Sequence, residues 1–292
     1  MPVDHEIDSR NENIQIYING SFYHRDEAKI SVYDSGFLMG DGIWEGLRLV
    51  NNKWIFIEEH IDRLFEGCKA IDLDIKMTKE DIVNALDETK AINNMSNEVH
   101  ARLMITRGNK LKPFQQPNLS ESGINIVIIM EHSKPSIDVK NIAMATVPQV
   151  RGMPMSQDPK LNSHSKLNCI LACIQANKLG ADEALMLDPL GFVNTTNSCN
   201  FFIVKNNQVW TSTGDYCMNG VTRQNVINLC KENNIAIHEK NFSLVDVYSA
   251  DEAFITGTLG SLTNVISIDN RKIGIDSNPV TDTLRKYYKK LL

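Results

Sequence analysis

Several absences limit what this sequence can encode. Its longest apolar run, residues 124–130 with Asn125 inside it, is far too short to span a bilayer. Basic residues are not in excess, because 30 Lys and Arg stand against 36 Asp and Glu, for a formal net charge of −6. Such a balance provides no electrostatic footprint for nucleic acid or for an anionic membrane. We therefore expect neither nucleic acid nor a membrane among the partners.

Cysteine is present but shows no pattern of its own. The six cysteines form no C-x-x-C pair, and none lies near a histidine at the spacing of a zinc finger. Cys169 and Cys173 are four residues apart in an expected helix, where buried free thiols are the usual explanation. Residues 1–13 are polar and acidic, without the basic start and apolar stretch of a signal peptide. We expect a reducing, cytoplasmic location and no structural metal.

The pattern of polar and apolar residues predicts an α+β fold in two domains. The 292 residues, 42% of them hydrophobic, can bury two compact cores. Antiparallel hairpins are expected about Asn19-Gly20 and Asn51-Asn52, mixed with a few helices, which favours α+β over a doubly wound parallel sheet. The polar segment 131–136 is the expected linker, although it can also be an ordinary surface turn. We place a smaller N-terminal α/β domain at 1–135 and a larger C-terminal α/β domain at 136–292.

Individual elements follow from local periodicity and end signals. Strands are expected at 14–18, 44–50, 54–57, 100–106, 124–130 and 142–147, with a strand pair at 184–187 and 200–204. Helices are expected at 58–71, 78–92, 165–179 and 222–233, with a terminal helix from residue 280.

Separated segments of the chain are suited to hold a phosphate. Gly220-Val221-Thr222-Arg223 opens a helix, where free backbone N–H groups and the positive end of the dipole favour an anion. The small-residue loop 257–261 can form a backbone nest with hydroxyl donors, and Arg63 can act as a bidentate clamp. An ordinary N-cap threonine or a solvated arginine would look the same. The Walker and Rossmann glycine patterns are absent, so we do not expect the phosphate to be part of a nucleotide.

The sequence resembles the class IV aminotransferases, the branched-chain and D-amino-acid type, through five motifs in family order. The first is residues 34–48, DSGFLMGDGIWEGLR, which resemble the D-x-G-F-x-x-G-D-G-x-[FYW]-E-x-x-R signature. The others are similar to H-x-x-R-L at 60–64, A-D-E-A-L-x-L-D at 181–188, G-[IV]-T-R at 220–223 and [ST]-x-T at 256–258. The matches extend from about residue 14 to residue 275, which is nearly the whole chain.

This resemblance implies a cofactor, an architecture and an assembly. The family binds pyridoxal 5′-phosphate in a cleft between two α/β domains, and a homodimer completes each site. Carried over to this chain, the resemblance assigns the cofactor to Arg63, Val221, Thr222, Gly257 and Thr258.

Two departures from the family pattern concern the chemistry, and the first is at the lysine. Relatives carry the Schiff-base lysine just before a helix, in a K-x-x-N-x-L-like context, and an ungapped match puts Asn162 in its place. Lys160 is two residues earlier and would share a strand face with Asn162. Lys166 is one helical turn later, so its side chain would return towards the same face. We predict that Lys166 forms the Schiff base, with Lys160 as the alternative.

The second departure is Thr195, which stands where relatives have the glutamate that pairs with the pyridine nitrogen. A carboxylate keeps that nitrogen protonated and makes the ring a strong electron sink. A hydroxyl can only share a hydrogen bond, so the sink should be weaker and proton abstraction should depend more on the lysine. We expect Thr195 to face the pyridine nitrogen.

Candidates for substrate binding come from both subclasses of the family. Arg102 corresponds to a position where branched-chain relatives bind the substrate carboxylate, although an arginine in a strand can equally form a salt bridge. Lys112, together with Lys110, lies in the loop where D-amino-acid relatives carry their cations. Met39 and Trp44, in the signature segment, are further candidates. The identity and stereochemistry of the substrate stay open.

The resemblance predicts an enzyme that is a transaminase. It would move an amino group between a small amino acid or amine and a 2-keto acid. An aminodeoxychorismate-lyase-type enzyme shares the opening steps and is an alternative. Asn162 and Thr195 motivate a third interpretation, a cofactor-binding protein with lapsed catalysis.

Overall fold

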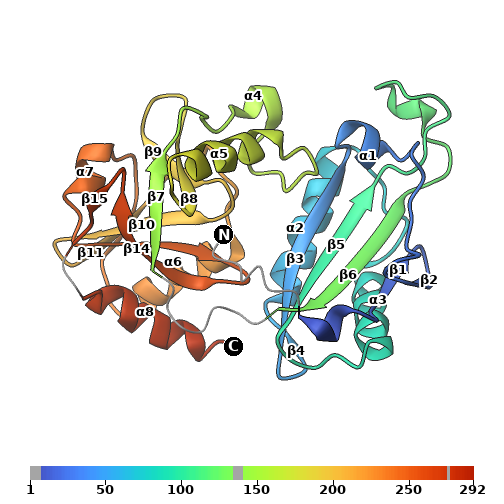
Figure 1. Cartoon of the computed structure of the whole chain (residues 1–292), viewed down its shortest axis with the longest axis horizontal. Coiled ribbons are helices and arrows are strands. Elements are labelled where there is room, and N and C mark those ends of the chain that lie inside the picture. The colour runs from blue at the N-terminus through green and yellow to red at the C-terminus, as the bar shows by residue number, and fades with distance from the viewer. Residues whose placement is uncertain (1–7, 134–140, 275–276) are drawn as a thin grey trace. The chain divides into compact units, whose positions relative to one another are not determined.

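The computed structural model describes residues 8–133, 141–274 and 277–292, which form two compact units (Figure 1). The N-terminal unit holds residues 8–133 together with Asn162–Lys166, and the C-terminal unit holds the other described residues. The expected boundary at residue 135 lies outside the described residues. Residues 162–166 join the N-terminal unit through backbone hydrogen bonds, since Trp44 N donates to Asn162 O and His164 N donates to Gly42 O, both at 2.9 Å. Contiguous domain ranges did not include this return of the chain.

A six-stranded antiparallel sheet, in the order β2-β1-β6-β5-β3-β4, is the framework of the N-terminal unit. Both predicted hairpin turns are confirmed. Asn19 and Gly20 have φ of 50° and 86°, and Asn51 and Asn52 have φ of 47° and 64°, in the left-handed region that a type I′ turn needs. The strands are β1 (Gln15–Ile18), β2 (Ser21–His24), β3 (Gly42–Val50), β4 (Lys53–Trp54), β5 (Val99–Thr106) and β6 (Asn125–His132).

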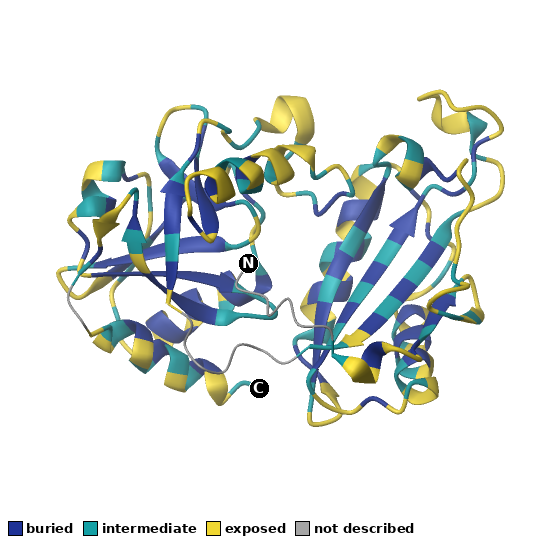
Figure 2. Cartoon of the chain, in the orientation of Figure 1, coloured by how far each residue is buried: buried dark blue, intermediate teal, exposed yellow. Residues whose placement is uncertain are grey.

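Helices cover this sheet and bury the alternate side chains of its strands (Figure 2). Helix α2 (Ile57–Ala70) packs on β3, and α3 (Lys79–Ile92) packs on β1 and β6. The helix start expected at residue 78 is confirmed, and Thr78 and Asp81 form a capping box there. The unit also has the short helix α1 (Ser35–Met39) and the 3-10 turns η1 (Ser9–Asn11) and η2 (Pro117–Leu119).

A nine-stranded mixed sheet forms the C-terminal unit, in the order β12-β11-β10-β13-β14-β7-β8-β9, with β15 on β14. Because β9 also pairs with β10, six of these strands close into a ring. The pairs β7–β8, β7–β14 and β11–β12 are parallel, which the predicted hairpins did not anticipate. The predicted strands β8 and β10 are not direct partners, since β9 lies between them.

The remaining elements complete this unit. Its strands are β7 (Ile142–Thr146), β8 (Glu183–Leu187), β9 (Val193–Thr196), β10 (Asn200–Lys205), β11 (Gln208–Thr211), β12 (Ile237–Glu239), β13 (Glu252–Gly257), β14 (Ser261–Ile268) and β15 (Arg271–Lys272). Its helices are α4 (Pro154–Gln157), α5 (Leu167–Lys178), α6 (Val221–Glu232), α7 (Leu244–Tyr248) and α8 (Pro279–Lys289). Phe202 and Phe254, stacked 4.9 Å apart on β10 and β13, are fully buried. None of the described helices combines the length and apolarity that a membrane crossing requires.

A buried carboxylate fixes the start of the terminal helix α8. Glu252, at the beginning of β13, accepts hydrogen bonds from Val280 N at 2.9 Å, Thr281 N at 2.8 Å and Thr281 Oγ1 at 2.6 Å. These bonds satisfy N–H groups that have no partner within the helix itself. Glu252 therefore replaces an ordinary N-cap side chain and joins α8 to the sheet.

Replacing Glu252 with Ala should lower the free energy of unfolding by roughly 2–3 kcal/mol, because buried donors lose a charge-assisted acceptor. Urea denaturation followed by circular dichroism measures this loss. The matched variant Glu232→Ala, at an exposed position of α6, should change the same free energy by less than about 0.5 kcal/mol. An equal loss in the two variants would contradict the capping role of Glu252.

Candidate functional site

The first part of the signature segment is held by a buried aspartate. Asp34 is fully buried and accepts hydrogen bonds from Phe37 N at 3.0 Å, Thr106 Oγ1 at 2.6 Å and Asn125 Nδ2 at 2.7 Å. The first of these bonds caps α1. A Cβ atom at Gly36 would overlap the Thr106 methyl group, so only glycine fits at this position. This part of the signature therefore shapes the backbone that leads into β3.

An ion pair fixes the next part of the segment to helix α2. Arg107 Nε donates to Asp41 at 2.8 Å, and Ser35 Oγ donates to the same carboxylate at 2.6 Å. Burial would raise the pKa of Asp41, but the bonds from Arg107 and Ser35 outweigh it and lower that pKa. Arg107 also donates to the carbonyls of Ile71 and Asp72, just beyond the end of α2, at 2.7 and 2.9 Å. Arg107 thus connects Asp41, just before β3, to the end of α2.

Trp44 is the centre of a cluster of predicted site residues in the N-terminal unit. Its indole Nε1 donates to Ser163 O at 3.2 Å, in addition to the backbone bond to Asn162. The guanidinium carbon of Arg102 lies 3.9 Å from the centroid of the indole ring, and Lys166 Nζ lies 5.6 Å from it. The structure therefore brings together Trp44, Arg102 and Lys166, which the resemblance had assigned to substrate and cofactor binding.

Arg102 carries a charge that no carboxylate balances among the residues the structure describes. Burial lowers the pKa of this half-buried guanidinium. Burial and the charge of Arg102 together lower the pKa of His100 to about 4. Stacking on Trp44 offsets part of the cost of burying the cation. No carboxylate in the described chain therefore supports a salt bridge of Arg102, whereas an anionic ligand fits this side chain.

Arg63 lies on α2 and is held by a buried carboxylate. Its Nε and Nη2 donate to the two oxygens of Glu45, both at 2.8 Å, and His60 Nδ1 lies 2.8 Å from Glu45 Oε2. Successive strand residues point to opposite faces, so Glu45 lies on the face of the sheet opposite to Trp44. Glu45 thus occupies the Nε–Nη2 edge of the guanidinium for which a phosphate clamp was predicted.

The structure separates the two candidate lysines. Lys160 is exposed in a turn of the C-terminal unit, so the expected strand that would place it beside Asn162 does not form. Helix α5 begins at Leu167, so the expected helical return from residue 162 to residue 166 is also wrong. Ser163 instead forms a bridge to Ile43, and Lys166 is a half-buried residue just before the helix. Its place beside Trp44 comes from the strand-like pairing of 162–164 with β3.

Asn162, in the position of the family lysine, is itself buried. Its side chain is 4% exposed, and its Oδ1 has no hydrogen-bond partner among the described residues. The neighbouring His164 Nε2 is buried and unpartnered in the same sense. Burial lowers the pKa of His164, and the nearby charges of Arg102 and Lys166 lower it further. Unpaired buried polar atoms are costly, so a polar ligand that formed hydrogen bonds with these two atoms would offset that cost.

Residues of three neighbouring strands line up in the C-terminal unit. Asn200, the first residue of β10, pairs with Thr195 on β9 and with Thr256 on β13. The hydroxyl of Thr195 donates to Cys199 O at 2.7 Å. Asn200 Nδ2 donates to Met218 O at 2.9 Å, which connects this row of residues to the segment before α6. Thr195 and the two predicted phosphate segments are therefore parts of one connected structure.

The start of α6 and the turn after β13 have the features of an anion site. Gly220 is the N-cap of α6, and no side chain caps the helix there. Val221 and Thr222 are buried in the first turn, and Thr258 lies in the turn that joins β13 to β14. Thr256 Oγ1, just before that turn, is buried without a partner in the described part of the chain. An uncapped helix N-terminus near an unsatisfied hydroxyl fits a phosphate group.

Other predicted residues are less constrained. Met39, at the end of α1, is exposed, and Lys112 is exposed in the loop before β6. Lys110 is buried instead, with Nζ donating to Gln116 O at 3.1 Å. Sequence reasoning did not single out Glu45, although the E of the signature and the R of H-x-x-R were both recognised. Nothing in the spacing of those two motifs shows that they form an ion pair.

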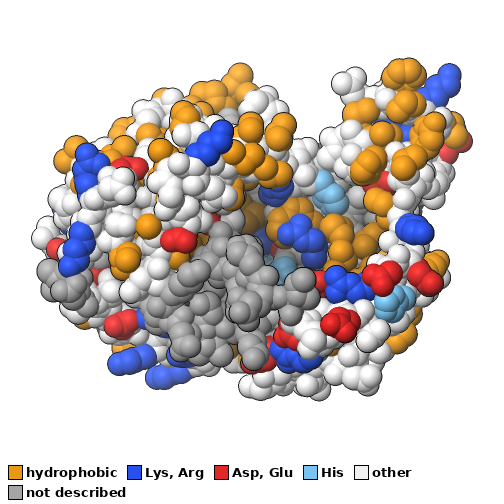
Figure 3. Space-filling model, in the orientation of Figure 1, with side chains coloured by type: hydrophobic (Ala, Val, Ile, Leu, Met, Phe, Trp, Pro, Cys, Tyr) orange, Lys and Arg blue, Asp and Glu red, His pale blue; other side chains and the backbone are white. Residues whose placement is uncertain are grey.

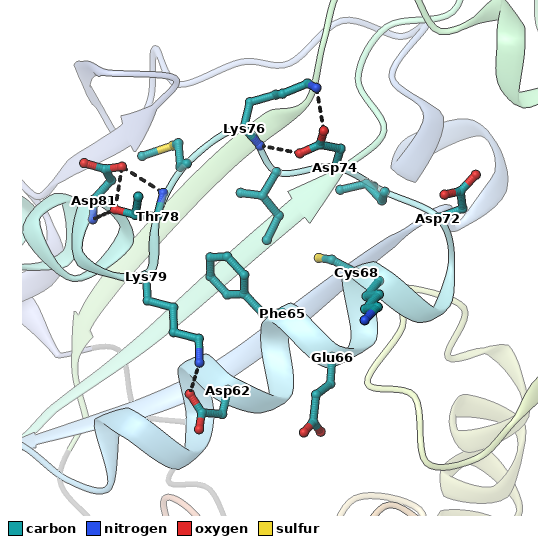
Figure 4. Close-up of a pocket in the computed structure, with 14 residues that line it drawn as sticks. Asp62, Phe65, Glu66, Cys68, Asp72, Asp74, Lys76, Thr78, Lys79 and Asp81 are labelled. Carbon is teal, nitrogen blue, oxygen red and sulfur yellow. Dashed lines mark hydrogen bonds and ion pairs between the residues drawn. The ribbon is translucent and has the colours of Figure 1, made fainter.

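A separate open pocket of about 740 Å³ lies in the N-terminal unit between α2 and the start of α3 (Figure 4). Its side chains largely satisfy one another. Lys79 Nζ pairs with Asp62 at 2.6 Å, and Lys76 Nζ pairs with Asp74 at 2.5 Å. None of the predicted site residues lines this pocket. The candidate site is therefore defined by its contacts and not by this cavity.

Comparisons with known proteins agree on a family. The sequence model of the family "Amino-transferase class IV" matches residues 42–268. The chain is 38% identical over 96% of its length to "Branched-chain-amino-acid aminotransferase-like protein 2" of Arabidopsis thaliana, and it spans about half of that relative, 51%. It is 37% identical to the "Putative branched-chain-amino-acid aminotransferase" of Methanocaldococcus jannaschii, with 94% of this chain and 96% of the relative covered.

A solved structure extends this likeness to the fold. The branched-chain amino acid aminotransferase of T.th., complexed with N-(5′-phosphopyridoxyl)-L-glutamate, is similar to this chain with a TM-score of 0.87 at 26% identity. The likeness covers 95% of this chain and 93% of that one. The mixed helix and sheet architecture expected from the resemblance is thus confirmed.

Replacing Arg102 with Ala should raise the pKa of His100 from about 4 towards its usual range, because a nearby positive charge is removed. Nuclear magnetic resonance of labelled histidine, followed from pH 3.5 upwards, measures this pKa. The variant Lys79→Ala, whose ammonium pairs with Asp62, should leave the pKa of His100 unchanged. An unchanged His100 titration in Arg102→Ala would contradict the arrangement about Trp44.

Proposed function

The chain belongs to the class IV amino-transferase family, and on that basis we propose that it is a pyridoxal-phosphate-dependent transaminase. Its substrates would be a small amino acid or amine and a 2-keto acid. The observation that carries this proposal is the cluster on Trp44, where Arg102 and Lys166 lie on one indole. A cation for a substrate carboxylate and an amine for a carbonyl are the two groups that such a reaction requires.

The proposed cofactor contacts begin at the phosphate. In the C-terminal unit, the N–H groups of Val221 and Thr222 and the turn at Gly257 and Thr258 would bind it. The uncapped start of α6 and the unpartnered Thr256 hydroxyl support this assignment. The phosphopyridoxyl compound bound by the similar solved aminotransferase is consistent with it.

Thr195 would meet the pyridine nitrogen through a hydroxyl. Its own proton is directed at Cys199 O, so a lone pair of the hydroxyl is left to accept a hydrogen bond. A neutral acceptor of this kind holds a ring proton less firmly than a carboxylate does. We expect the proton chemistry to depend more strongly on Lys166 for this reason.

Lys166 would be the amine that bonds to the cofactor and transfers the proton. Pyridoxal 5′-phosphate, when bound, supplies an aldehyde and an electron-withdrawing ring. Both nucleophilic attack and proton acceptance need the neutral form of this amine. Nζ of Lys166 would take the proton from the substrate α-carbon and later return it. Arg102 would orient the substrate through its carboxylate.

We also propose a homodimer in a cytoplasmic location. Apolar side chains about α1 and the loop before β6 are exposed together, as the upper part of the N-terminal unit in Figure 3 shows. Lys110 N donates to Tyr33 O, so the two segments that carry them are neighbours. A second copy of the chain would cover such a surface. The six cysteines are free, which supports a reducing compartment. The exposed apolar residues are Val32, Tyr33, Phe37, Leu111 and Phe114.

The purified protein should take up pyridoxal 5′-phosphate, and borohydride should then fix the cofactor to Lys166. Peptide mapping by mass spectrometry identifies the labelled lysine. The variant Lys166→Ala should lose the label, whereas Lys160→Ala should keep it, because Lys160 is exposed in a turn.

Each other outcome points to a different conclusion. Label on Lys160 would reject Lys166 and leave the family assignment intact. Cofactor uptake without any label, and without turnover of amino donors, would support the lapsed enzyme. Many equivalents of keto product per enzyme, formed from the donor without an amino acceptor, would favour the lyase, because a transaminase stops after one equivalent. Failure to bind the cofactor would reject the proposal as a whole.

The variant Arg102→Ala should raise KM for amino acids by about 10- to 100-fold, the loss expected for a charge-assisted bond to a carboxylate. KM for a primary amine without a carboxylate should change little. Steady-state assays with a matched amino acid and amine, and pyruvate or 2-oxoglutarate as acceptor, measure both. The control is Lys112→Ala, and a larger effect there would place carboxylate recognition in the loop before β6.

A further inference from the structure

Glu45 forms a buried charged network with Arg63 and His60. Its side chain is fully buried, whereas that of Arg63 is 18% exposed. Both carboxylate oxygens are used, one by Arg63 Nε and the other by Arg63 Nη2 and His60 Nδ1, all at 2.8 Å. Two parallel bonds fix both the position and the plane of the guanidinium. Glu45 thus holds one edge of Arg63 from inside the unit.

From this geometry we infer that Glu45 is a positioning residue, which orients the Arg63 guanidinium for the phosphate group of the cofactor. The inference rests on the proposed function, and it adds Arg63, which the resemblance assigned to the cofactor, to the proposed phosphate ligands. Glu45 itself does not touch the phosphate. It occupies the Nε–Nη2 edge, so the phosphate must be met by another part of the guanidinium.

The charge state of the network is consistent with this role. Burial alone would raise the pKa of Glu45, but the hydrogen bonds from Arg63 and His60 outweigh burial and lower that pKa. Glu45 is therefore ionised at neutral pH and remains bound to the guanidinium. A rigid cation has already lost its rotamer freedom, so less entropy is lost when it binds an anion.

A positioning role and a purely structural role of Glu45 predict different effects on phosphate binding. Pyridoxal and pyridoxal 5′-phosphate share the ring and the aldehyde but differ in the phosphate. The ratio of their affinities therefore reports phosphate recognition separately from general folding or ring binding. A residue that only stabilises the fold would change both affinities together and leave the ratio unchanged.

The experiment is equilibrium binding of pyridoxal and of pyridoxal 5′-phosphate to the full-length protein, followed by absorbance. In Arg63→Ala and in Glu45→Gln the affinity ratio should fall about tenfold or more, as for a lost or misplaced charge-assisted bond. The double variant should fall no further than Arg63→Ala, because Glu45 acts only through Arg63. Asp87→Asn is the matched control, since it removes a carboxylate of the same unit that binds Trp54 and Lys90. Its ratio should stay at the wild-type value.

The outcomes separate the inference from the proposed function. A drop in Arg63→Ala without one in Glu45→Gln would overturn the positioning role alone. No drop in Arg63→Ala would reject Arg63 as a phosphate ligand, and the role of Glu45 with it. If Glu45→Gln does not fold, Arg63→Lys decides, because a lysine keeps the charge but cannot bind both oxygens of Glu45 as a fork. A wild-type ratio in Arg63→Lys would overturn the inference.

Discussion

The candidate site depends on a short backbone pairing between distant parts of the chain. Residues 162–164 lie beside the start of β3 through bonds from Trp44 N and His164 N, although more than a hundred residues separate the two segments. This pairing places Lys166 near the indole of Trp44 and brings Asn162 into a buried position. Backbone hydrogen bonds do not depend on side-chain identity. The geometry can therefore persist while the residue at position 162 changes.

Much of the signature segment serves to make that pairing possible. Asp34, Asp41 and Arg107 hold the turn that leads into β3, and Glu45 holds the opposite face of the strand against α2. These side chains satisfy one another and have little need of a ligand. Arg102 is different, because its buried charge has no carboxylate partner in the described chain. Most charged side chains of the signature segment thus serve the fold, whereas Trp44 from the same segment contacts Arg102 and Lys166.

Local signals in the sequence predicted local structure well. The hairpin turns at Asn-Gly and Asn-Asn and the helix start at Thr78 were recognisable because a few adjacent residues decide them. The start of α5 was placed too early, at residue 165, because residues 162–164 pair with β3 and the helix begins only at Leu167. Strand β9 was missed because its sequence, Val-Asn-Thr-Thr, is polar although all four residues are buried. The pairing of Arg63 with Glu45 and the parallel strand pairs depend on tertiary contacts that no local pattern records.

The closed ring of strands in the C-terminal unit has a consequence for how such a site can diversify. A sheet that closes on itself has no free edge at β9, so the backbone at Thr195 is fixed by strands on both sides. The proposed contact of Thr195 with the pyridine nitrogen would then depend on its side chain, whereas the frame around it is made by backbone pairing. Side-chain chemistry at this position and the shape of the frame would vary separately.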